Sequence, residues 1–157
     1  MFDTIVWATD GSDAADRAMP YARELAIRHE ARLIVVHVAE TFSAHMAAGM
    51  PVRADEPDTR AKVERQGAEL AAADIDTELK ILSGHAPHAA HSIADAAREA
   101  GADLIIAGTR GHTPMAGLVV GSVTHRLLQL APCPVLAIPS EHVRPAGHAA
   151  QVAAATA

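Results

Sequence analysis

Residues 103–138 read DLIIAGTRGHTPMAGLVVGSVTHRLLQLAPCPVLAI and contain the most informative pattern in the chain. Apolar runs at the two ends of this stretch predict buried strands, one over Leu104–Ala107 and one over Val135–Ile138. An amphipathic segment between them predicts a helix from about Gly121 to Leu130, which Pro132 brings to an end. A glycine-rich loop joins the first strand to the helix. This order of strand, loop, helix and strand is typical of an α/β fold.

The glycines of this loop have a regular spacing. Two residues separate Gly108 from Gly111, and nine more precede Gly121 and Ser122, which gives Gly-x2-Gly-x9-Gly-Ser. Glycine lets the backbone approach a ligand closely, and the unpaired amides of a helix's first turn attract an anion. The loop holds no lysine and is not a P-loop. From the spacing alone, a phosphate-binding loop and a long connection capped by Ser122 are equally well supported.

The rest of the chain alternates between predicted strands and helices. Three more strands are expected over Thr4–Thr9, Arg32–Ala39 and Asp76–Leu82, and the last of these alternates in polarity, as a strand near a sheet edge does. Helices are expected from Ser12 or Asp13 to Ala26 with a bend at Pro20, from Asp58 to Ala73, and from Pro87 to about Ala100 with Gly101 as the stop. The chain should therefore form a five-stranded parallel sheet with helices on both faces, a Rossmann-like α/β fold.

Helical spacing also predicts which side chains enter the core. In the first helix these are Ala14, Ala18, Tyr21, Ala22, Leu25 and Ala26, and in the second Ala61, Val63, Leu70 and Ala72. Trp7 should face away from Ala8, beneath the opposite helix layer. We expect one domain over residues 1–139, a loop without an assigned role over 40–57, and a mobile Ala-rich tail over 140–157.

Composition narrows the classes of function. The chain has 157 residues and a net charge of −6, which argues against nonspecific binding to nucleic acid or to an anionic membrane. No apolar run approaches the ~20 residues of a membrane span, and the first residues lack the basic start of a signal peptide. Cys133 is the only cysteine, which fits a reducing cytoplasm. With prolines on both sides, it is expected to be a small buried hydrophobe rather than a nucleophile.

Three separate stretches are expected to meet in one crevice. Asp10, Val38 and Gly108 each come at the carboxyl end of a predicted strand. In an open parallel sheet, ligands bind beyond these ends, near the point where the strand order reverses.

The glycine loop, together with Thr9-Asp10-Gly11-Ser12 and His37-Val38, resembles the universal stress protein family, specifically its ATP-binding branch with an adenine nucleotide alpha hydrolase-like fold. The resemblance extends from about Phe2 to Pro139. It implies that Ala8 and Val38 lie beside the adenine. It also implies that the remaining nucleotide-binding residues are Thr9, Asp10, Gly108, Thr109, Arg110, Gly111, His112, Gly121, Ser122 and Val123. Of these, Gly111, Gly121, Ser122 and Val123 would meet the phosphates, largely through backbone amides, while Arg110 and His112 are optional charge partners.

The resemblance further implies ATP and Mg²⁺ as ligands, a cytoplasmic stress-response role, and a homodimer paired through Val135–Ile138. We expect little or no turnover, because the sequence offers no evident general base near Ser122. A cyclic AMP-binding protein of the same family and a dimeric scaffold without a nucleotide stay open as alternatives. An adenylating enzyme of the related superfamily is disfavoured, because Thr9-Asp10-Gly11-Ser12-Asp13 lacks that superfamily's Ser-Gly-Gly signature.

A group of histidines has a different spacing. His85, His88 and His91 follow a His-x2-His-x2-His pattern around a predicted helix start. A zinc or nickel site is conceivable there, but no acidic or cysteine ligand accompanies the histidines at the usual spacing. Exposed histidines without a metal are the favoured interpretation.

Overall fold

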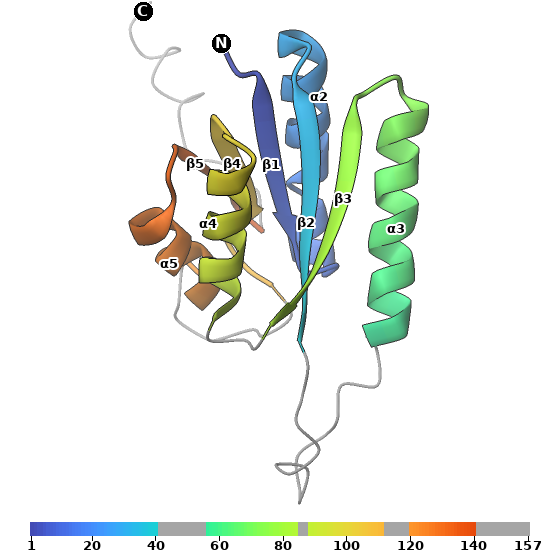
Figure 1. Ribbon diagram of the computed structural model, residues 1–157. Helices are drawn as coiled ribbons and strands as arrows, with labels where there is room; N and C mark the ends of the chain where they lie inside the picture. Colours follow the sequence, from blue (N-terminus) through green and yellow to red (C-terminus); the bar gives the residue numbers. More distant parts are fainter. Residues whose placement is uncertain (41–55, 85–87, 112–119, 141–157) are drawn as a thin grey trace, which may run out of the picture.

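A computed structural model describes residues 1–40, 56–84, 88–111 and 120–140. Five parallel strands form one sheet in the order β3-β2-β1-β4-β5, with helices on both faces (Figure 1). The predicted fold class is confirmed. In chain order the elements are β1 Thr4–Thr9, α1 Asp13–Asp16, α2 Met19–His29, β2 Arg32–Glu40, α3 Glu56–Ala72, β3 Thr77–Gly84, α4 Ala89–Glu99, β4 Leu104–Gly108, α5 Ser122–Leu130 and β5 Val135–Ile138.

The order of the strands creates a switch point beside β1. The chain builds outward from β1 through β2 to β3, then returns to the other side of β1 with β4 and β5. Ala8 pairs with Ala107 of β4, and Thr9 pairs with His37 of β2. The carboxyl ends of β2, β1 and β4 therefore lie side by side, which is where an open parallel sheet binds its ligands.

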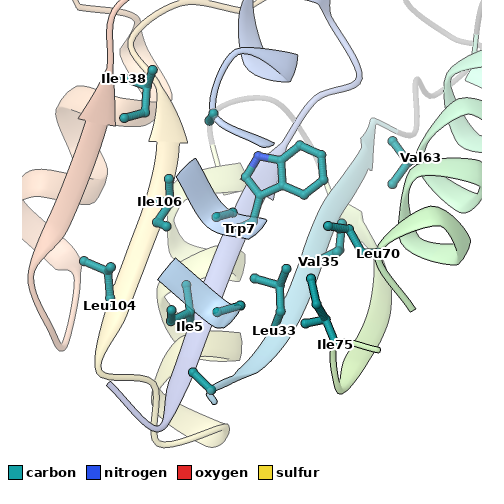
Figure 2. Close-up of a cluster of buried hydrophobic side chains, with 14 residues drawn as sticks. Ile5, Trp7, Leu33, Val35, Val63, Leu70, Ile75, Leu104, Ile106 and Ile138 are labelled. Atoms are coloured by element: carbon teal, nitrogen blue, oxygen red, sulfur yellow. The ribbon is translucent and has the colours of Figure 1, made fainter. Parts of the chain in front are cut away.

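One hydrophobic core fills the space between the sheet and α2 and α3. Trp7 is completely buried at its centre and lies between Val35 and Ile106, its partners in the neighbouring strands (Figure 2). Val63 and Leu70 of α3 close this core from the side of β3. Ala8, one residue further along β1, belongs to the core on the other face. The prediction for Trp7 is confirmed.

A second core lies under α4 and α5. Alanines dominate the buried face of α4, and their small side chains let the helix backbone approach the sheet closely. Leu127 is the fully buried anchor of α5 on the same face. α5 packs mainly against α4, so the two helices together cover this face of the sheet.

The helix predicted after Ser12 is in fact two helices. Ser12 caps α1 as expected, because its side chain accepts a hydrogen bond from the Ala15 amide. After only four residues α1 ends, and α2 begins at Met19. Pro20 lies in the first turn of α2, where its missing N–H breaks no helical bond, so it starts a helix instead of bending one. The new helix turns Tyr21 outward, 43% exposed, so its predicted core position is wrong.

Most other boundaries agree with the sequence to within two residues. β3 begins and ends slightly later than predicted and forms a sheet edge. Gly101 follows α4 with φ +63°, as expected of a helix stop. Ala72 of α3 is exposed, so its predicted place in the core is wrong. The predicted 40–57 loop and 140–157 tail fall almost entirely outside the described residues, and no described helix is long and apolar enough to cross a membrane.

Candidate functional site

β1 ends in a tight turn that orients the carboxylate of Asp10. Its Oδ1 accepts hydrogen bonds from the amide of Ser12 at 3.0 Å and from the hydroxyl of Ser12 at 2.6 Å. Gly11 takes up φ +75°, a conformation that favours glycine, and its amide donates to Thr9 Oγ1 at 3.1 Å. The turn thus holds one carboxylate at the switch point of the sheet.

Helix α3 fastens this turn from the outside. Lys62 Nζ donates to the carbonyl oxygen of Gly11 at 2.8 Å and pairs with Asp16 at 2.6 Å and Asp13 at 3.2 Å. A Cβ at Gly11 would lie 2.6 Å from Thr59 Cγ2, so the helix packs directly on the turn. Burial alone would lower the pKa of Lys62, but the hydrogen bonds and charges of Asp16 and Asp13 outweigh it and raise that pKa. Sequence reasoning missed Lys62, because no local signal marks a partner 51 positions away.

The glycines of the loop lie where side chains have no room. A Cβ at Gly108 would come within 3.1 Å of the Ala14 carbonyl oxygen. A Cβ at Gly111 would overlap the Asp10 carboxylate oxygen Oδ2. The structure therefore brings Asp10 and Gly111, about a hundred positions apart in the chain, into direct proximity, as the convergence of strand ends predicted.

The start of α5 corrects one detail of the expected site. Gly121 caps the helix, and its amide donates to the Thr109 carbonyl oxygen at 2.6 Å. The expectation that the Gly121 amide faces a phosphate is wrong, because the protein itself uses that donor. Ser122 and Val123 are the first two residues of the helix, and helix geometry gives their amides no partner within it. These two amides are among the donors that the first turn can offer to an anion.

Further hydrogen bonds tie the loop to the neighbouring elements. The Thr109 amide donates to the Ile138 carbonyl oxygen at the end of β5 at 2.7 Å, and Thr109 Oγ1 accepts from the Ser140 amide at 3.3 Å. Thr124 of α5 donates its hydroxyl to the Gly108 carbonyl oxygen at 2.7 Å. Sequence reasoning did not single out Thr124. The end of β4, the end of β5 and the start of α5 form one hydrogen-bonded unit.

The other predicted residues spread along the same edge. Ala8 is buried near the end of β1, and Val38 is half-buried near the end of β2. Strands are spaced ~4.8 Å apart, so the ends of β2 and β4 are separated by about 10 Å. Arg110 is exposed beside Gly111, and His112 lies outside the described residues.

The sequence also indicated a group of histidines and a single cysteine. His88 and His91 are exposed, as expected, with ring centroids 6.1 Å apart, while His85 lies outside the described residues. Among the residues that are described, no three His, Cys, Asp or Glu side chains form a group that could hold a metal ion.

Cys133 is half-buried and packs against the second core. Burial, followed by the charge of Asp103, raises the pKa of its thiol, which disfavours the reactive thiolate.

Comparison with known proteins supplies the family. Residues 1–139 match the model of the Universal stress protein family. The chain belongs to this family. A universal stress protein of Thermus aquaticus is 38% identical over 140 residues, which cover 88% of this chain and 99% of the relative.

Solved universal stress proteins share the fold. A member of the family from Burkholderia pseudomallei is 30% identical with a TM-score of 0.62, covering 87% of this chain and 96% of its own. A universal stress protein solved in complex with cAMP is 25% identical with a TM-score of 0.65, covering 89% of this chain and 98% of its own. These solved structures cover 87% and 89% of the present chain.

Proposed function

We propose that this universal stress protein binds ATP together with Mg²⁺ at the carboxyl edge of its sheet and acts as a homodimeric regulatory protein with little or no turnover. The observation that carries the proposal is the meeting of Asp10, Gly111 and the first turn of α5 at the switch point. In this reading Ala8 and Val38 contact the adenine, and Thr9, Asp10, Gly108 and Thr109 lie near the ribose.

The phosphate end of the proposed ligand fits the start of α5. The amides of Ser122 and Val123 point from a helix N-terminus, whose dipole favours negative charge. Because Gly111 has no Cβ, the Asp10 carboxylate can lie directly against the loop. Arg110 and His112 are further candidates for contact with the phosphates. These features support an anion next to α5 despite the net charge of −6.

Mg²⁺ fits the site only as a companion of the phosphates. The metal prefers oxygen ligands and often combines one or two carboxylates with phosphate oxygens and water. Asp10 is the carboxylate that the turn after β1 holds at this edge. Bound there, Mg²⁺ would neutralise phosphate charge. The described residues hold no cluster that could bind the metal without the nucleotide.

Cyclic AMP is the second candidate ligand. The solved relative in complex with cAMP supports it, since that protein is similar to this chain over 89% of its length. Cyclic AMP has no β- or γ-phosphate and so would not need Mg²⁺. We favour ATP because the first turn of α5 offers backbone donors to a phosphate chain.

The proposed dimer is built from β5, an edge strand of the sheet that the described residues form. Such an edge presents unpaired backbone groups that a second copy can pair with. The single cysteine, Cys133, is compatible with the cytoplasmic location that we also propose.

Isothermal titration calorimetry with ATP and with cyclic AMP, each in Mg²⁺ and in EDTA, tests this function. We expect ATP to bind and EDTA to weaken its binding, whereas EDTA should not change the affinity for cyclic AMP. A Gly121→Glu variant places a bulky anion at the start of α5, where even a Cβ would lie 3.2 Å from the Thr109 carbonyl oxygen. It should lose ATP affinity by roughly a hundredfold or more.

The matched control is Ala71→Glu, which adds the same charge on the exposed side of α3. It should bind ATP as the unmodified protein does. Undiminished ATP binding by Gly121→Glu, or no affinity of the unmodified protein for any adenine nucleotide, would contradict the proposal and favour a scaffold. A phosphate-release assay checks the expected low turnover.

A further inference from the structure

A buried hydroxyl joins the glycine loop to the start of α5. Thr124 is only 5% exposed, and its Oγ1 donates to the Gly108 carbonyl oxygen at 2.7 Å. Thr124 is the third residue of α5, in the same turn as Ser122 and Val123. Gly108 is the last residue of β4. The bond therefore connects the end of the strand directly to the turn whose amides are left for an anion.

A backbone bond acts next to it. The Gly121 amide donates to the Thr109 carbonyl oxygen at 2.6 Å, one residue before the helix begins. Together the two bonds hold the first turn of α5 against β4 at two points, one before the helix and one within it. A methyl group in place of the Thr124 hydroxyl would have the same shape but would leave the buried Gly108 carbonyl without this donor.

We propose that Thr124 is a positioning residue for the phosphates: its hydroxyl, bonded to Gly108, holds the amides of Ser122 and Val123 where they meet the anionic end of a nucleotide. This inference rests on the proposed nucleotide-binding function. Thr124 is buried beneath the turn and acts through α5, without contacting the ligand.

Two substitutions at Thr124, each tested with ATP and with adenosine, examine the proposal. Thr124→Val keeps the shape and removes the donor, whereas Thr124→Ser keeps the donor. We expect the valine variant to bind ATP roughly three- to tenfold more weakly, in line with the loss of one hydrogen bond, and adenosine as before. The serine variant should bind both ligands like the unmodified protein. Adenosine has no phosphates, so a general loosening of the fold would weaken both ligands alike.

Thr77→Val is the matched control. Thr77 Oγ1 also donates to a backbone carbonyl, that of Ile75, at 3.0 Å. It does so at the amino end of β3, the opposite end of the sheet from the site. The same chemical change there should alter neither affinity.

Equal ATP affinities for Thr124→Val and the unmodified protein, or equal losses for ATP and adenosine, would overturn the inference. If the unmodified protein binds neither ligand, the proposed function fails. Hydrogen exchange of the protein without ligand then tests whether the Thr124 hydroxyl holds the first turn of α5 in place. The probe is the His125 amide, which donates to the Gly121 carbonyl oxygen at 2.9 Å. Faster exchange with valine but not with serine supports the positioning of the turn, and unchanged exchange overturns it. Should the valine variant not fold, Thr124→Ala replaces it in every measurement.

Discussion

At the scale of single residues, Asp103 fastens the beginning of β1. Its Oδ2 accepts the amide of Asp3 at 2.8 Å and that of Thr4 at 2.9 Å. The hydrogen bond from the Thr4 amide, followed in size by that from the Asp3 amide, lowers the pKa of the Asp103 carboxyl. Because the unfolded chain takes up the proton at a higher pH than the folded protein does, the contribution to stability is complete at neutral pH. It is lost as the pH falls from the ordinary aspartate value through the lowered one.

An Asp103→Asn variant tests this linkage. We expect the free energy of unfolding to fall less steeply with acid in the variant than in the unmodified protein, since asparagine has no charge to lose. Urea unfolding between about pH 7 and about pH 3 measures both slopes. Identical slopes would show that the carboxylate of Asp103 does not carry this part of the acid response.

The residues of the site differ in how far the sequence announces them. Asp10 and Gly108 follow apolar runs, so their place at strand ends could be predicted from periodicity alone. The use of the Gly121 amide by Thr109 could not, because a glycine pattern does not tell which donors the protein keeps for itself. Lys62 was equally hidden, because its partners are brought to it only by the packing of α3.

At the scale of elements, Lys62 is the link between α3 and the turn after β1. Replacing it by methionine keeps most of the apolar stem but removes the bonds to Gly11 and Asp16. We expect Lys62→Met to lower the free energy of unfolding by about 1 kcal/mol, the scale of a partly exposed ion pair with hydrogen bonds. The raised pKa of Lys62 means that this contribution persists through neutral pH and disappears only as the pH rises above the ordinary lysine value.

Lys80→Met provides the comparison for urea unfolding. Lys80 is exposed to the same degree as Lys62, with 28% for each side chain, but its contact with Glu78 is a distant 3.9 Å. Its replacement should change stability by much less. If the two variants lose similar amounts of stability, the bonds of Lys62 to Gly11 and Asp16 make no specific contribution to the free energy of unfolding.

The sequence predicted the boundaries of the strands better than the break between the first two helices. The strands could be found as apolar runs because a parallel strand is buried on both faces. The break between α1 and α2 was missed because alanines at 14, 18, 22 and 26 fit one continuous helix equally well. Pro20 was the local signal for it, since a proline in a first turn is more favourable than a proline inside a helix.

At the scale of the whole molecule, the edge strand β5 tests the proposed dimer. The Ile105 amide donates to the Pro134 carbonyl and the Thr109 amide to the Ile138 carbonyl, so alternate residues of β5 face β4. Val135 and Ala137 lie between them in this alternation and direct their backbone groups to the open side. Ala137→Pro would remove an outward N–H while leaving the bonds to β4 intact. We expect it to shift the protein from dimer to monomer in sedimentation experiments.

Ser83→Pro makes the same change on the opposite edge. The Leu33 amide donates to the Asp76 carbonyl, which by the same alternation turns Ser83 of β3 outward. This variant should leave the assembly unchanged. A dimer that survives Ala137→Pro, or dissociates equally in both variants, would contradict pairing through β5.

The complete burial of Trp7 has a practical consequence. It is the only tryptophan of the chain, it lies at the centre of the sheet, and its indole Nε1 has no hydrogen-bond partner among the described residues. Its fluorescence therefore originates from one dry environment and should shift to longer wavelength when water enters the core. A single intrinsic chromophore thus reports on unfolding of the molecule in every variant above, without any label having to be attached.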